Sequence, residues 1–184
     1  MSDVDVLESV LAKDGALIAA VGPDQLSAPT PCPEYAVHDL VNHLVRWVKL
    51  FDASANGRSF DIEAAPVESD DPATDFQRSA TSLISGWRSG GVDRTVPMTG
   101  GDLPAQMVLS MTLMEYLAHG CDLAMATGQP VPFSDTELAI GLDRAQGTLP
   151  EQYRGEGQPF GLIIDVPDAA PVLHRFLGFM GRAA

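Results

Sequence analysis

The chain contains one stretch, PAQMVLSMTLMEYLAHGCDLAMAT (residues 104–127), around which the other segments can be arranged. Between residues 103 and 121 it is apolar or small almost throughout, which predicts a central helix that is buried on all sides. The only groups there that should carry charge are Glu115 and His119, which lie four residues apart and therefore share one face of a helix. A buried carboxylate is costly unless a cation satisfies it. Either His119 is the charged partner of Glu115, or a metal ion lies between them.

Length and charge restrict the class of protein. The 184 residues fit a single domain, residues 1–184, and are enough to bury a sizeable core. The net charge of -14 argues against binding to nucleic acid or to an anionic membrane surface, because both favour Lys and Arg. Cys32 and Cys121 are too few for a disulfide framework, and the first ten residues, MSDVDVLESV, have no secretory signal pattern. We expect a cytoplasmic protein without a membrane span, and the sequence is compatible with a homodimer.

Hydrophobic spacing predicts a mainly helical chain. The expected helices cover residues 4–21, 37–55, 72–89, 104–127, about 135–147 and about 171–180. Residues 92–103 could hold a short extended pair, residues 162–166 are typical of a short strand, and the Pro-rich connector SAPTPCPEY (residues 27–35) should be extended. Four long helices indicate an all-α bundle with short additional pieces packed on it.

A third candidate lies on the second predicted helix. His43 follows Leu40 by three residues and precedes Trp47 by four, so it borders the apolar face and should point inward. Together with Glu115 and His119 it could form a metal site across the bundle core, where zinc, nickel or ferrous iron would suit two imidazoles and a carboxylate. Spacing alone also allows an intrahelical ion pair and a core histidine that hydrogen-bonds to the backbone.

Two motifs resemble a known family. TPCPEYAVHDLVNHLV (residues 30–45), followed by EYLAHGCDLAMATGQP (residues 115–130), is similar to the actinobacterial family related to the metal-binding domain of mycothiol-dependent maleylpyruvate isomerase, within the DinB-like superfamily. The closing FGLIIDVPDAAPVLHRFLGFMGR (residues 160–182) also looks like that family. The resemblance implies a DinB-like four-helix bundle in which His43, Glu115 and His119 hold a divalent metal, with zinc as the first choice and mycothiol as a cosubstrate.

Some residues depart from the family pattern. Tyr35 and Cys121 stand where the family often has Trp, and His38 stands where it often has Arg. These changes alter the expected pocket lining and so leave the substrate open. The full isomerase has a further C-terminal domain for which the segment after Gly128 leaves no room, so we do not transfer the isomerase reaction.

For other residues near the three candidate ligands, the sequence predicts a role less specifically. Asp122 could orient His119 or serve only in helix packing or at the surface. Cys32 and Cys121 are expected to be structural. The methionines of the central helix are expected to fill packing space; they are Met107, Met111, Met114 and Met125.

Two main functions follow from these patterns. The first is a thiol-dependent metalloenzyme of the transferase or isomerase type, or a metal-dependent hydrolase, in which the metal activates a thiol or water toward a small molecule. The second is a non-catalytic module of the same fold that holds a metal or a small ligand. A third, a scaffold with a vestigial site, would contain no stoichiometric metal.

Overall fold

A computed structural model describes residues 2–33, 35–155, 158 and 160–183 of the chain. Within these residues the elements in chain order are α1 (Asp3–Ala19), the 3-10 turn η1 (Pro23–Gln25), α2 (Val37–Ala55), α3 (Pro72–Gly90), β1 (Thr95–Met98), β2 (Gly101–Pro104), α4 (Ala105–Thr127), α5 (Asp135–Thr148), η2 (Glu151–Tyr153) and α6 (Val172–Phe179). The structure confirms the predicted all-α class with one short hairpin. Glu34, in the predicted connector, lies outside the described residues.

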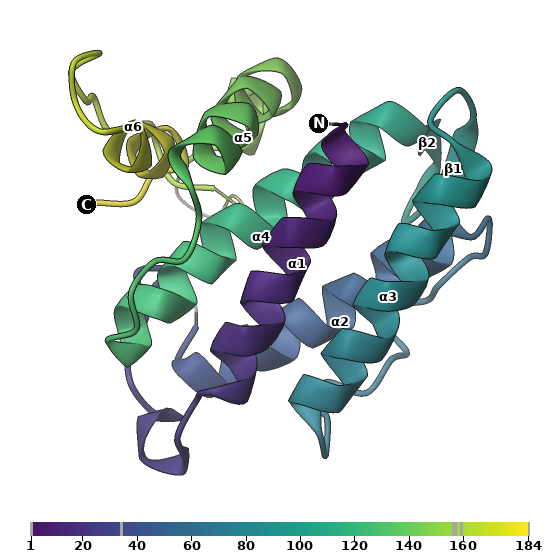
Figure 1. Ribbon diagram of the computed structural model, residues 1–184, viewed down its shortest axis with the longest axis horizontal. Helices are drawn as coiled ribbons and strands as arrows, with labels where there is room; N and C mark the ends of the chain where they lie inside the picture. The colour runs from purple at the N-terminus through teal and green to yellow at the C-terminus, as the bar shows by residue number, and fades with distance from the viewer. Residues whose placement is uncertain (1, 34, 156–157, 159, 184) are drawn as a thin grey trace.

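The first four helices form the bundle. In Figure 1, α1 crosses the front of the molecule between α4 and α3, and α2 lies behind it. Helix α1 packs against α3 and α4, and α2 packs against the same two helices, so the four close around one core. The largest fully buried side chains come from all four helices and from α6; they include Leu7, Phe51, Phe76, Trp87, Tyr116 and Phe176. Burial of this apolar surface is the main stabilising contribution.

Local sequence signals set the ends of the helices. Helix α4 ends at Gly128, which adopts the left-handed conformation (φ 67°) that glycine reaches without a steric cost. Helix α5 begins with a capping box, because the Ser134 side chain accepts a hydrogen bond from the Glu137 backbone N–H while the Glu137 carboxylate accepts one from the backbone of Ser134. Both positions agree with the predicted helix bounds at residues 127 and about 135.

The C-terminal third packs on the outside of the bundle. Helix α5 lies against α4, and α6 lies against α5, to one side of the bundle in Figure 1. Residues 162–166 belong to no strand, so the predicted strand is wrong: within the described residues no strand pairs with them, and the Ile164 N–H bonds to the carbonyl of Gly178 in α6. After α6 the chain turns at Gly181 (φ 77°) and brings Arg182 back into the protein, where it is 6% exposed.

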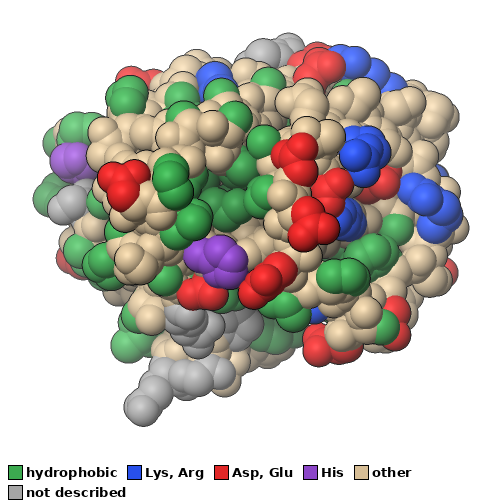
Figure 2. Space-filling view, turned by 90° about the horizontal axis from the view of Figure 1, so that it is seen from below, with side chains coloured by type: hydrophobic (Ala, Val, Ile, Leu, Met, Phe, Trp, Pro, Cys, Tyr) green, Lys and Arg blue, Asp and Glu red, His purple; other side chains and the backbone are tan. Residues whose placement is uncertain are grey.

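The surface carries mixed charges. On the face shown in Figure 2, most of the Lys and Arg side chains lie on the right, among Asp and Glu side chains, so this face has no uninterrupted basic patch. No helix in the part of the chain that the structure describes is long and apolar enough to cross a membrane.

Candidate metal centre

Helices α2 and α4 bring the three predicted side chains together. His43 Nε2 lies 2.6 Å from Glu115 Oε1, and His119 Nε2 lies 3.5 Å from the same oxygen. One ligand atom from each of the three residues can be chosen so that all lie within 4.8 Å of one another. The buried Tyr116 hydroxyl donates to the Leu44 carbonyl (3.1 Å) and so fixes α4 against α2 beside this cluster.

His119 is held from behind by a carboxylate. Its Nδ1 lies 3.1 Å from Oδ2 of Asp122, which is fully buried. The Arg182 guanidinium donates to the same carboxylate through Nε and Nη2, the latter at 2.9 Å. Burial alone would raise the pKa of Asp122, but the hydrogen bond from His119 and the charge of Arg182 lower it, so the carboxylate stays ionised. An ionised acceptor at Nδ1 keeps a proton there and directs Nε2 of His119 toward Glu115.

The His43 ring is also oriented by a hydrogen-bonding group at its Nδ1. The Tyr35 hydroxyl lies 3.0 Å from His43 Nδ1, which leaves Nε2 facing Glu115. Tyr35 is itself positioned by the connector, where the Thr30 hydroxyl contacts the carbonyls of Tyr35 (2.8 Å) and Cys32 (2.9 Å). Both imidazoles therefore have one ring nitrogen bound to an orienting group and the other directed into the cluster.

The surroundings of Glu115 keep its carboxyl group ionised, and this negative charge favours a cation beside it. Burial raises the pKa of this carboxyl, but the nearby His119 and the hydrogen bond from His43 outweigh burial and lower the pKa to about 2. The side chains of His43 and Glu115 are 15% and 14% exposed, so the cluster is largely shielded but open on one side. In its neutral form, with the Nδ1 proton directed at Asp122, His119 would present the lone pair of Nε2 to the Glu115 carboxylate, so that two acceptors would face each other. A second proton on His119 or a bound cation would satisfy both, and two imidazoles with a carboxylate suit a divalent ion.

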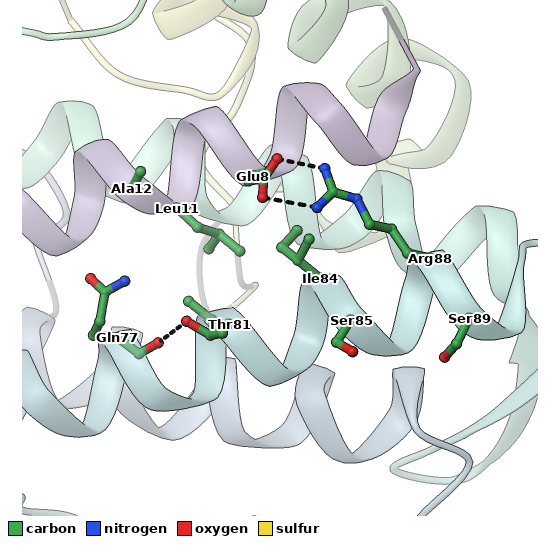
Figure 3. A pocket seen from close by; sticks show the side chains of 10 residues that line it. Glu8, Leu11, Ala12, Gln77, Thr81, Ile84, Ser85, Arg88 and Ser89 are labelled. Carbon is green, nitrogen blue, oxygen red and sulfur yellow. Dashed lines mark hydrogen bonds and ion pairs between the residues drawn. The ribbon is translucent and has the colours of Figure 1, made fainter.

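The open side leads into a cavity of about 660 Å³. Its wall comes from the connector, α2, α4, β2, the last residue of α5 and the segment that follows it. The lining residues are Cys32, Tyr35, His43, Trp47, Phe51, Leu103, Met107, Met111, Met114, Glu115, His119, Thr148, Leu149, Tyr153, Gln158 and Phe160. A hollow of similar size between α1 and α3 is crossed by the Glu8–Arg88 ion pair (Figure 3). It contains none of the three candidate ligands, so the chemistry is assigned to the first cavity.

The structure revises several readings of the sequence. Cys32 was expected to be structural, but it lines the cavity. Met107, Met111 and Met114 also line it, whereas Met125 does not. Asp122 contacts His119, which agrees with the first of the roles considered for it, orientation of that ring. The role of Arg182 was missed, because no local pattern joins a C-terminal arginine to an aspartate on α4. That the cluster binds a metal stays a prediction.

Comparison with known proteins extends these findings. The sequence profile of the mycothiol maleylpyruvate isomerase N-terminal domain matches residues 9–124. Two uncharacterized proteins, from two strains of Mycobacterium tuberculosis, are each 32% identical over 173 residues, which cover 91% of this chain and 90% of the relative. The crystal structure of a mutant of mycothiol-dependent maleylpyruvate isomerase superposes with a TM-score of 0.59 at 13% identity, covering 91% of this chain and 77% of that chain. This likeness shows the fold, and it includes part of the segment after residue 124.

Proposed function

The chain belongs to the mycothiol maleylpyruvate isomerase N-terminal domain family, and from that premise we propose that it binds one divalent metal ion through His43, Glu115 and His119 and uses the ion to activate a thiol. Zinc is the first choice, because its protein sites commonly combine His and carboxylate ligands. The observation that carries the proposal is that both Nε2 atoms point at one Glu115 oxygen while Tyr35 and Asp122 engage the other ring nitrogens. Such supporting groups are typical of metal-binding histidines.

The chain's own residues have separate tasks in this proposal. His43 and His119 supply neutral nitrogen ligands, and Glu115 supplies the negative charge. Tyr35 and the Asp122–Arg182 pair orient the two rings. A bound divalent ion supplies Lewis-acid activation, which lowers the pKa of a thiol or of water.

The cavity provides room for the reacting partners. Three protein ligands leave a coordination position open, and the candidate ligands lie in the wall of a cavity whose volume is in the usual range for small-molecule sites. We propose mycothiol as the thiol, because the family profile and the structural neighbour both carry it in their names. The same site would act as a hydrolase if water took the place of the thiol.

The test combines metal analysis with turnover. Protein purified without added metal should contain about one zinc per chain, and His43→Ala should lose both the metal and the metal-dependent addition of thiol to an electrophile that is supplied with it. His38→Ala is the matched control, because His38 lies on the same helix with a side chain that is 46% exposed and is not part of the cavity wall. Stoichiometric metal without thiol consumption would instead favour a non-catalytic binding module. Absence of metal from the wild-type protein would refute the proposal.

A further inference from the structure

Outside the metal cluster the wall of the cavity is mainly apolar. Apart from the Trp47 indole, its other oxygen- and nitrogen-bearing side chains are three hydroxyls and one amide, those of Tyr35, Thr148, Tyr153 and Gln158. Met107, Met111 and Met114 recur along one side of α4, and Trp47 and Phe51 face them from α2. Leucine and aromatic side chains from β2 and from the segment after α5 complete the enclosure; they are Leu103, Leu149, Tyr153 and Phe160. Methionine side chains are flexible and polarizable, so such a wall adapts to apolar ligands of different shape.

Away from the metal cluster, the same wall offers no charged partner to an anionic ligand. None of the described residues that line it is Lys or Arg. Arg182 is the cation that interacts with Glu115 electrostatically, but its guanidinium is bound by Asp122 and it is not part of the wall. A carboxylate or sulfonate placed among these side chains, away from the metal cluster, would exchange its hydration for hydroxyl and amide donors without gaining a cationic partner, which is costly.

We propose that the second substrate of this site is an uncharged, apolar molecule rather than an organic acid. This rests on the proposed function, because it assigns a substrate class to the same metal site. Apolar contact with α2 and α4 supplies the binding free energy, and the polar end of the cavity at Glu115 receives the reacting group.

A matched pair of fluorescent probes tests the charge preference. N-phenyl-1-naphthylamine is neutral, and 8-anilino-1-naphthalenesulfonate is the same diarylamine with one sulfonate added. Titration of each into the metal-loaded protein should give a dissociation constant at least about tenfold lower for the neutral probe, a difference of about 1.4 kcal/mol.

Two methionines of α4 provide the matched variants. Met107 and Met125 are both 39% exposed, but only Met107 lines the cavity. Met107→Arg should weaken binding of the neutral probe and strengthen binding of the sulfonate, because it adds a cation to the wall. Met125→Arg should leave both affinities unchanged.

The outcomes separate this inference from the proposed function. Equal or tighter binding of the sulfonate to the wild-type protein would overturn the inference, and so would identical behaviour of the two arginine variants. The titrations are repeated on metal-free protein. If the protein proves to bind no metal yet keeps the preference for the neutral probe, the proposed function fails while the charge preference of the cavity stands.

Discussion

The Arg182–Asp122 pair should support both the fold and the candidate site. Asp122 is fully buried and receives hydrogen bonds from Arg182 and His119, so Arg182→Met would leave an uncompensated charge in the interior. Loss of one partner from a buried ion pair typically costs about 3–5 kcal/mol. Urea unfolding of the metal-free protein should show a loss of that size.

A double variant separates the two effects. Replacement of Asp122 with Asn in the Arg182→Met background removes the buried charge and should recover most of the free energy of unfolding. Metal affinity, measured by competition with a chromophoric chelator, should remain about 10-fold to 100-fold below that of the wild-type protein, because the carboxylate that supports His119 is gone. The reasoning is refuted if Arg182→Met unfolds at the wild-type urea concentration, or if the double variant binds metal as tightly as the wild-type protein.

Three further substitutions test other contacts. Glu137→Gln should lower the free energy of unfolding by about 1–3 kcal/mol at pH 7. Burial raises the pKa of Glu137, but the hydrogen bonds from Lys13 and its other donors outweigh burial and lower the pKa to about 2. Urea unfolding at several pH values should therefore show that the loss shrinks as the pH falls from 4.5 toward 2. Burial raises the pKa of Asp14 well above 3.8, so above pH 3.8 the folded state keeps a proton that the unfolded state loses. The free energy of unfolding should therefore fall as the pH rises toward the folded-state pKa, by up to about 1.4 kcal/mol per pH unit. Asp14→Asn should remove this contribution in unfolding measured from about pH 4 to 8, and a pH dependence equal to that of the wild-type protein would contradict the assignment. Tyr35→Phe removes the hydroxyl beside His43 and should lower metal affinity about tenfold without changing the unfolding midpoint of the metal-free protein; equal affinity would exclude a positioning role.

Local sequence patterns were sufficient for most of the fold. The α2 bounds agree with its apolar spacing, and the ends that Gly128 and the Ser134 capping box give to two other helices agree with the predicted ranges. Inward placement of His43 and the shared face of Glu115 and His119 also follow from helical periodicity. These features depend on residues within a few turns of one another.

Contacts between distant segments could not be predicted in the same way. Periodicity placed Asp122 near the His119 face but could not identify Arg182, sixty residues later, as its partner. Asp14 was not singled out, although it is buried where the absent side chain of Gly120 leaves space for its carboxylate. A sequence pattern gives the face of a helix but not the residue that packs on it.

The most direct test of the account is a crystal structure of the zinc-loaded protein with anomalous diffraction data collected at the zinc absorption edge. The account predicts one strong peak about 2.0–2.2 Å from Nε2 of His43, Nε2 of His119 and a carboxylate oxygen of Glu115. A peak bound by other residues, or no peak at this cluster in protein that contains stoichiometric zinc, would contradict it.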